Sequence, residues 1–259
     1  MTFRIAYCMH RGASPRQQDA LLIGTGVHQS ANLLPAEIVH DGNVLIALAD
    51  GVAASPHAQL ASRFVLNALP QVLQQRPEWQ QDGFVTGRHV REVHARLCAD
   101  IAQRPQLHGS STTLVVAQVK DTRAAVLNSG DSRAYVRRAD GDVRQVSRDH
   151  TELQQLRDSG EADDSTEYAS LYGALSDCLV ADSLESSFAI HLATPLLAAG
   201  DMLVLCTDGV HDVLGDRRWK QLIGENADPL LLVSVARAAV LEAGAFDNFS
   251  VIALLNQGQ

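Results

Sequence analysis

The chain has 259 residues, of which 46% are hydrophobic and 20% charged, and its net charge of −9 gives a pI near 5.5. This composition is ordinary for a globular protein with a substantial core, and we expect a single domain over residues 1–259. The acidic balance, with no basic patch or tail, argues against binding to nucleic acid or to an anionic membrane. An excess of acid also suits a protein that holds divalent cations, although a plain acidic surface explains it equally well.

The sequence carries no signal for export or membrane insertion. No apolar run approaches the ~18 residues that a membrane span needs, and the first residues lack the apolar core of a signal peptide. The four cysteines are scattered without CxxC spacing, and Cys206 lies in an apolar run that suits a buried free thiol. We expect a cytoplasmic protein, and we take it to be a monomer.

Short strands dominate the predicted secondary structure, and three helices interrupt them. Nine runs rich in apolar and β-branched residues, bounded by Gly, Asp, Asn or Pro, indicate strands. They are Phe3–Met9, Ala20–Ile23, Val44–Ala49, Thr112–Val119, Ala124–Leu127, Ala134–Arg137, Phe188–Leu192, Met202–Cys206 and Ser250–Leu255. Apolar residues at helical spacing indicate helices at His57–Leu73, Arg88–Ile101 and Pro229–Leu241. Helices segregated from clustered strands predict an α+β fold, with a sheet sandwich flanked by helices.

The dipeptide Asp-Gly occurs five times, and by itself it signals only a tight turn. We expect hairpin turns at Asp41-Gly42 and Asp140-Gly141 and a polar loop at Asp82-Gly83. Asp50 and Asp208 differ, because each follows an apolar run in which an unpaired carboxylate is costly to bury. A metal ion, a helix N-terminus or exposure to solvent could each relieve that cost.

A third acidic residue, Asp247, directly precedes the last apolar run. Aspartates at the ends of buried strands can meet at one edge of a fold, and carboxylate oxygens suit hard divalent ions. No cluster of His and Cys favours a softer ion. Together with Asp50 and Asp208, Asp247 therefore predicts a site for Mg²⁺ or Mn²⁺.

Seven motifs in order along the chain resemble those of the PP2C-type (PPM) metal-dependent serine/threonine phosphatases, in their short bacterial form. The motifs are RQQDA with Asp19, LADGVAA with Asp50, GSSTT with Thr112, NSGDSRAY with Asp131, SRDHT with His150, CTDGVHD with Asp208, and DNFS with Asp247. The series spans about Met9 to Leu255. The resemblance implies a four-layer αββα fold, in which two antiparallel sheets form a sandwich with helix pairs outside. It also implies a binuclear Mn²⁺ or Mg²⁺ centre at one edge of the sandwich.

The resemblance also implies roles for the matching residues. Asp50 would bridge the two metal ions, and the carbonyl of Gly51 would ligate the second ion. Asp208 and Asp247 would complete the protein ligands of the first ion. Asp19 would hold a metal-bound water.

A third, weaker metal ion is common in bacterial members, and its matching ligands are Asp131 and Asp212. Asp131 could equally serve a turn or strand end, and Asp212 could equally cap a short helix starting near Val213. Eukaryotic members have a His that acts as general acid after the Asp-Gly pair; Val52 stands there in this chain, and bacterial members also lack that His. For His150 we expect a structural hydrogen-bonding role.

The first motif departs from the family pattern. Ser14 stands where members usually have the Arg that grips the substrate phosphate, and Gln17 replaces an Asn. Arg16 or Arg11 could take over the phosphate, because arginine makes paired contacts to it, or either could be a solvated loop residue. A loop around residues 152–170, short and acidic, corresponds to the family's flap.

The function implied by the resemblance is hydrolysis of phosphoserine and phosphothreonine in proteins, by attack of a metal-bridging hydroxide. The partner would be a phosphorylated protein substrate, and the enzyme would be paired with a Ser/Thr kinase. An alternative is a non-catalytic domain of the same family that binds a phosphoprotein or regulatory partner; the irregular first motif supports it and the intact aspartates oppose it. A hydrolase of small phosphate esters is a third candidate.

Overall fold

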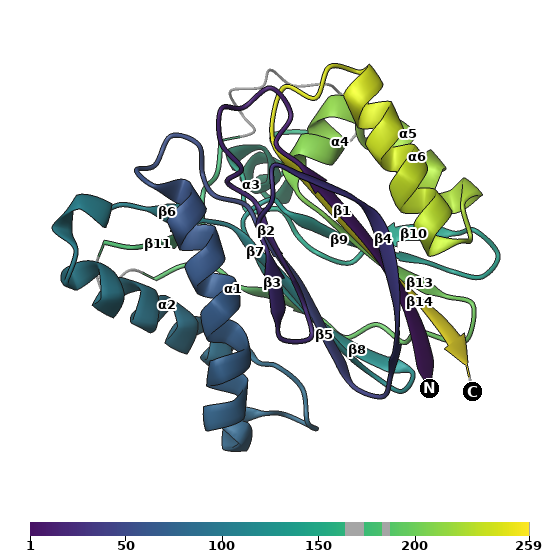
Figure 1. Cartoon of the computed structure of the whole chain (residues 1–259), viewed down its shortest axis with the longest axis horizontal. Coiled ribbons are helices and arrows are strands. Elements are labelled where there is room, and N and C mark those ends of the chain that lie inside the picture. Colours follow the sequence, from purple (N-terminus) through teal and green to yellow (C-terminus); the bar gives the residue numbers. More distant parts are fainter. Residues whose placement is uncertain (164–173, 183–186, 259) are drawn as a thin grey trace.

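The structure, a computed structural model, describes residues 1–163, 174–182 and 187–258. Two six-stranded sheets lie face to face, with helices on both outer faces (Figure 1). Sheet A has the strand order β10-β9-β13-β14-β1-β4 and sheet B the order β12-β8-β7-β5-β2-β3. Every pairing within the two sheets is antiparallel. The predicted α+β sandwich of four layers is therefore confirmed.

The elements have the following bounds. Sheet A contains β1 (Thr2–His10), β4 (Asn32–Asp41), β9 (Arg133–Arg137), β10 (Val143–Gln145), β13 (Met202–Cys206) and β14 (Phe249–Gly258). Sheet B contains β2 (Ala20–Ile23), β3 (Gly26–His28), β5 (Val44–Ala49), β7 (Leu114–Lys120), β8 (Arg123–Ser129) and β12 (His191–Ala193). A separate pair is formed by β6 (Ser111–Thr112) and β11 (Leu179–Val180). The helices are α1 (Ala58–Gln75), α2 (Gly87–Ala102), α3 (Glu152–Ser159), α4 (Asp208–Leu214), α5 (Asp216–Glu225) and α6 (Pro229–Glu242), with 3₁₀ turns at Pro77–Trp79 and Pro105–Leu107.

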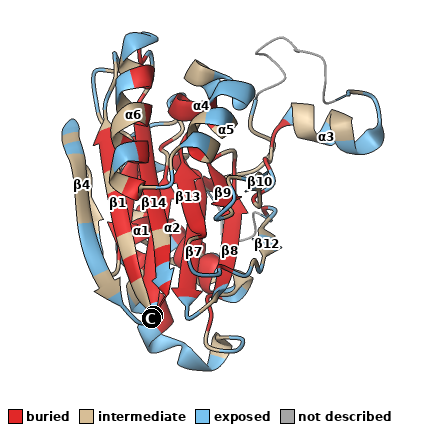
Figure 2. Ribbon diagram, turned by 90° about the vertical axis from the view of Figure 1, so that its right-hand side faces the viewer, coloured by how far each residue is buried: buried red, intermediate tan, exposed pale blue. Residues whose placement is uncertain are grey.

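The central strands are buried on both faces, which is why the sequence shows them as unbroken apolar runs (Figure 2). In β13, Leu203 and Leu205 face the core between the two sheets. Met202, Val204 and Cys206 alternate with them and pack against the layer of α4, α5 and α6. Strand β5 alternates in the same way between the core of the sandwich and the layer of α1 and α2. The fold therefore has three apolar cores between four layers.

The apolar runs located the buried elements closely. The strands Ala20–Ile23, Val44–Ala49 and Met202–Cys206 are confirmed at both ends, and the three predicted helices begin and end within two residues of α1, α2 and α6. Two predicted strands were partly wrong. The run at Thr112–Val119 is divided at Thr113 into β6 and β7, and the run at Phe188–Leu192 yields only β12, which begins at His191.

Elements at the surface were missed. Within the described residues these are β3, β4, β10 and β11 among the strands and α3 and α5 among the helices. A short helix was expected from near Val213, but α4 begins earlier, at Asp208. Strand β4 is the outer edge of sheet A, contains Pro35, and exposes Leu34 and Val39. An edge strand of this kind lacks the regular alternation of a half-buried strand, so its sequence gives little signal.

The turn at Asp140-Gly141 joins β9 to β10 as a hairpin, with the Arg138 amide donating to the Asp142 carbonyl at 2.8 Å. The predicted hairpin at Asp41-Gly42 was wrong. Strand β4 pairs with β1 in sheet A, whereas β5 pairs with β2 and β7 in sheet B, so this turn carries the chain from one sheet to the other. The reason is burial: β5 is apolar on both faces and needs a central position, while β4 suits an edge.

The structure also bears on two other features, the segment expected as a flap and the length and apolar character of the helices. Of the segment 152–170 expected as a flap, residues 152–159 form α3, and residues 164–170 lie outside the described residues. Over the described part of the chain, no helix has both the length and the apolar character to cross a membrane.

Candidate metal centre

The strand register gathers several chain segments at one edge of the sandwich. In sheet B the end of β5 meets the start of β7, with Leu48 opposite Val115. In sheet A the end of β13 meets the starts of β14 and β9, with Cys206 opposite both Val251 and Arg133. Four aspartates that are far apart in the sequence flank these strand ends: Asp50, Asp131, Asp208 and Asp247.

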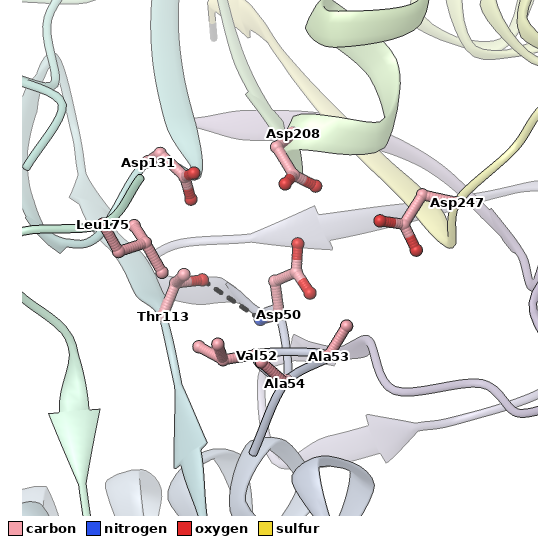
Figure 3. Close-up of a pocket in the computed structure, with 10 residues that line it drawn as sticks. Asp50, Val52, Ala53, Ala54, Thr113, Asp131, Leu175, Asp208 and Asp247 are labelled. Atoms are coloured by element: carbon pink, nitrogen blue, oxygen red, sulfur yellow. Dashed lines mark hydrogen bonds between the residues drawn. The ribbon is translucent and has the colours of Figure 1, made fainter. Parts of the chain in front are cut away.

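The four aspartates line one cavity of about 400 Å³. Their carboxylates approach a common space from different sides, with Asp131 and Asp247 at opposite ends and Asp50 facing Asp208 (Figure 3). The rest of the lining is small or apolar and consists of Gly51, Val52, Ala53, Ala54, Thr113 and Leu175. The structure thus brings together five of the predicted site residues, Gly51 included.

Backbone hydrogen bonds fix the position of Asp50. Its carbonyl accepts from the Thr113 amide and from the Thr112 hydroxyl, each at 2.8 Å, and its amide donates to the Thr113 hydroxyl at 3.1 Å. The next residue must be glycine, because a Cβ on Gly51 would lie 2.6 Å from the carbonyl oxygen of Ala58. The end of β5 is therefore held rigidly between β6–β7 and the start of α1.

Asp208 is the first residue of α4, so the helix N-terminus that the sequence left open as one explanation is present. This positive end of the helix dipole favours a carboxylate. One oxygen of Asp208, Oδ1, is nevertheless buried without a hydrogen-bond partner. Gly209 allows the helix to begin here, because a Cβ at this position would lie 1.9 Å from the Asn248 carbonyl oxygen.

Asp212 does not line the cavity. Its side chain is exposed, and the residue lies inside α4. The predicted alternative, that Asp212 caps a helix starting near Val213, was wrong, because the helix already begins at Asp208 and Thr207 precedes it. Asp212 Oδ1 lies 3.0 Å from Nδ1 of His211, whose Nε2 lies 3.2 Å from the Asp131 carbonyl oxygen. Desolvation would raise the pKa of Asp212, but the contact with His211 outweighs it and lowers this pKa below its ordinary value.

Asp19 is completely buried behind the cavity. Its Oδ2 accepts from the hydroxyls of Thr207 at 3.0 Å and Ser250 at 2.7 Å, while Oδ1 has no hydrogen-bond partner. Burial, reinforced by the charge of Asp208, raises the pKa of Asp19 to about 7. Asp19 therefore ties the end of β13 to the start of β14, directly beneath the lining aspartates.

The cavity concentrates negative charge in a region of low solvent access. Burial first, and then the neighbouring carboxylates of Asp208 and Asp19, raise the pKa of Asp50 well above its ordinary value. Burial and Asp208 do the same for the pKa of Asp131, and burial raises the pKa of Asp208. Carboxylates that resist ionisation together in this way are stabilised by a nearby cation.

The donor set fits a hard divalent ion. All of the lining groups with charge are carboxylates, and the unpartnered oxygens of Asp208 and Asp19 leave ligand capacity unused. Among the described residues, no three His, Cys, Asp or Glu side chains already stand in position to hold a single ion.

Asn248 is a residue of the site that the sequence did not single out. It is buried, its Oδ1 accepts from the Gln18 amide at 2.5 Å, and its Nδ2 donates to the carbonyls of Arg11 at 2.8 Å and Arg16 at 3.1 Å. Asn248, which directly follows Asp247, thereby holds the loop between β1 and β2 in place. Its place in the DNFS motif was the available signal.

The two arginines proposed for the phosphate do not line the cavity. Arg11 and Arg16 are exposed on the loop that Asn248 holds, and the Arg11 guanidinium donates to the Pro15 carbonyl at 3.2 Å. The structural role predicted for His150 is confirmed, because its Nδ1 accepts from the Gly130 amide at 3.0 Å. Burial lowers the pKa of His150, which keeps this ring nitrogen available as an acceptor.

The fold of this chain is similar to that of solved serine/threonine phosphatases. The chain aligns with the crystal structure of the Mycobacterium tuberculosis serine/threonine phosphatase PstP/Ppp with a TM-score of 0.75 and 23% identity, over 99% of this chain and 100% of that one. It aligns with Staphylococcus aureus Stp1 with a TM-score of 0.77 and 20% identity, over 98% and 95%. A PstP catalytic domain in complex with two manganese ions gives a TM-score of 0.70 at 23% identity, over 98% and 99%.

Residues 10–239 match the family model described as Protein phosphatase 2C. The chain belongs to this family. In sequence it is 27% identical to the serine/threonine protein phosphatase PstP of M. tuberculosis over 220 residues, which are 83% of this chain and 40% of that protein. It is 22% identical to the serine/threonine phosphatase stp of Listeria innocua, over 82% of this chain and 84% of that protein. The chain thus spans about two fifths of the PstP relative, and Asp247 lies beyond the residues matched by the family model.

Proposed function

We propose that this protein is a metal-dependent phosphatase that hydrolyses phosphoserine and phosphothreonine in proteins. The observation that carries the proposal is the group of four aspartates around one cavity in a member of the protein phosphatase 2C family. Three of them, Asp50, Asp131 and Asp208, have raised pKa values. Such a cavity attracts cations and repels phosphate unless cations are bound. Metal-dependent hydrolysis of a phosphate ester agrees with both properties, because the cavity would bind the cations and the bound cations would then allow the phosphate to enter.

The aspartates would hold Mn²⁺ or Mg²⁺ in the cavity. In our proposal Asp50 would bind both ions, and the Gly51 carbonyl would bind the second. Asp208 and Asp247 would complete the protein ligands of the first ion. Divalent ions bound there would acidify water and neutralise charge on the phosphoryl group. A third, weaker ion would be held by Asp131 and Asp212, and the contact of His211 with both residues supports their pairing.

The protein's own groups would orient the reaction around these ions. Asp19 would accept a proton or a hydrogen bond from water, and its buried Oδ1, which has no hydrogen-bond partner, supports this role. Arg11 or Arg16, exposed on the adjoining loop, would bind the substrate phosphate as it approaches. Because Asn248 holds the loop that carries both arginines, it should affect substrate binding.

The first prediction therefore concerns Asn248. Asn248→Ala should raise KM for a phosphothreonine peptide, because the loop of Arg11 and Arg16 loses three hydrogen bonds to the Asn248 side chain. The unfolding free energy should fall by roughly 2–4 kcal/mol, since buried polar groups are left unpaired. The matched control is Asn256→Ala at the other end of β14, where the side chain is also buried and bonded to backbone at 2.8 and 2.9 Å. Equal changes of KM in both variants would refute the assigned role of Asn248.

The second prediction tests the activity itself. Purified protein should release phosphate from a phosphothreonine peptide in Mn²⁺ or Mg²⁺, and EDTA should stop the reaction. A hydrolase of small esters would turn over p-nitrophenyl phosphate but leave the peptide largely intact. Calorimetric binding of Mn²⁺ without turnover of either substrate would contradict the proposal and favour the second candidate, a non-catalytic domain that binds a phosphoprotein.

We propose further that the chain acts as a single domain and a cytoplasmic monomer, opposing a Ser/Thr kinase. The four free cysteines, three of them buried, are compatible with a reducing compartment. Burial raises the pKa of Cys206 to about 12, so this thiol is unreactive. A kinase partner follows from the proposed substrate, because phosphoserine and phosphothreonine in proteins are products of such kinases.

A further inference from the structure

A second cavity of about 450 Å³ has a polar lining with basic character. It is enclosed by the segment after β10, by α3, by β12 and by the start of α5. Four lining side chains are permanently cationic, Arg133, Arg148, Arg157 and Lys220, against two aspartates, Asp149 and Asp216. In a chain of net charge −9, a cavity with an excess of positive charge is a local exception.

The two aspartates of this cavity are already committed to Arg133. The Arg133 guanidinium donates to both oxygens of Asp149, at 2.6 to 3.0 Å, and to Asp216 at 2.5 Å. These contacts raise the pKa of Arg133 against the opposing effect of burial. Arg133 is thus a fixed part of the wall, and the aspartates have little capacity left to neutralise the other cations.

Lys220 is the best placed of those other cations. It is half-buried on α5, and among the described residues it forms no ion pair. Against burial, which would raise the pKa of Asp216, the charge of Arg133 and, to a smaller extent, that of Lys220 lower it. Arg148 pairs at the rim with Asp158 of α3, both side chains being about half exposed. Holding a lysine partly desolvated without a partner is unfavourable, and an anion in the cavity would offset that cost.

The basic cavity and the carboxylate cavity have no lining residue in common, but short stretches of chain connect their linings. Arg133 follows Asp131 by two residues at the start of β9. Asp216 begins α5 directly after α4, which carries Asp208. Asp149 precedes His150, whose ring accepts from the amide of Gly130. A peptide whose phosphorylated residue occupies the carboxylate cavity can therefore place a neighbouring side chain in the basic one.

We propose that the basic cavity binds an acidic side chain, or a second phosphoryl group, of the substrate close to its phosphorylated residue. The enzyme would then select acidic phosphoprotein sequences. This inference rests on the proposed function, because it names a substrate class for the same site. The arginine donors and the lysine ammonium match carboxylate and phosphate oxygens, and the cavity has ample room for such a group.

The test compares kcat/KM for two phosphothreonine peptides, one with glutamates flanking the phosphorylated residue and one with glutamines. The wild type should prefer the acidic peptide roughly 10-fold, the value of one charge-assisted contact. Lys220→Gln should reduce this preference to about 2-fold and leave kcat on the neutral peptide unchanged. The matched control is Lys120→Gln, which removes the chain's other lysine, an exposed residue at the end of β7. Lys220→Glu should reverse the preference in favour of a peptide with lysine flanks.

An unchanged preference in Lys220→Gln, or an equal loss in both lysine variants, would overturn the proposed anion site. Failure of the phosphatase function is distinguished by binding alone. Calorimetric titration of the acidic, unphosphorylated peptide should show weaker binding to Lys220→Gln than to Lys120→Gln even if no variant hydrolyses phosphate. Circular dichroism and melting temperature check that both variants fold, so a loss of binding is assigned to the missing charge.

Discussion

Phosphatase turnover with Mn²⁺ is expected to fall on the order of 10³-fold when Asp208 is replaced by Asn. The divalent ions contribute several kcal/mol to stabilising the transition state, and each 1.36 kcal/mol corresponds to a tenfold change in rate. Asn keeps the shape of Asp208 at the start of α4 but removes the charge that would hold the ion. The measurement is kcat/KM for a phosphothreonine peptide over a range of Mn²⁺ concentrations.

The chain supplies a matched control for this substitution. Asp140 also precedes a glycine, but it lies in the β9–β10 hairpin, where its side chain only accepts from the Asp142 amide at 3.0 Å. Asp140→Asn should therefore retain full turnover. If Asp208→Asn kept wild-type activity while Asp140→Asn did too, the carboxylate cavity would not be the catalytic centre.

The second large effect is on stability: in the metal-free protein, the Asp208→Asn variant should be more stable than the wild type. Without metal, Asp208→Asn should melt roughly 5 °C higher than the wild type at pH 8, because it relieves repulsion among the carboxylates of Asp50, Asp131 and Asp208. For a domain of this size, each ~1 kcal/mol of stabilisation raises Tm by roughly 2–4 °C. With saturating Mn²⁺ the order should reverse, since only the wild type gains stability from bound ions.

The sign of the pH dependence follows from the raised pKa values. Asp19 has a folded-state pKa of about 7 against an ordinary value of 3.8, so the folded state binds more protons in this interval. Its contribution to stability is fully present below pH 3.8 and is lost as the pH rises through 7. The raised pKa values of Asp50 and Asp131 act in the same direction.

Three histidines oppose this trend, and their effect must be cancelled out. Burial lowers the pKa values of His10, His89 and His150, so their contribution to stability rises with pH up to about their ordinary pKa of 6.5. The measurement is therefore the difference in Tm between Asp208→Asn and the wild type, both metal-free, from pH 5 to pH 8. This difference should grow with pH, and a constant or shrinking difference would contradict the assigned repulsion. Asp140→Asn should follow the wild type at every pH.

Much of the fold and of the candidate site could be predicted because burial leaves a direct trace in the sequence. Strands β5 and β13 need apolar residues on both faces, so their runs are unbroken and their ends are sharp. An aspartate directly beyond such an end is conspicuous, which is why Asp50 and Asp208 stood out. Asp247 stood out in the same way, just ahead of the last apolar run. The motif resemblance then supplied Asp131 together with the expected architecture, which the two antiparallel sheets confirm.

Position at the surface leaves no comparable trace. The edge strand β4 and the polar helix α5 satisfy their outer groups with solvent, so neither needs a strict pattern. The Asp41-Gly42 turn is locally like a hairpin turn, yet it joins two different sheets. Which sheet a strand joins depends on pairing with distant segments, and no local residue encodes it.

The sequence by itself determined which residues are buried, which acidic residues end buried strands, and to which family the pattern is similar. Only the tertiary structure decided that Asp19 lies beneath the cavity and bonds to Thr207 and Ser250, and that Asp212 stands outside the cavity. It also revealed Asn248 as the fastening of the arginine loop and the basic cavity around Lys220. The physical reason is that burial is a property of each segment, whereas these contacts join residues from separate strands that meet only when both sheets are assembled.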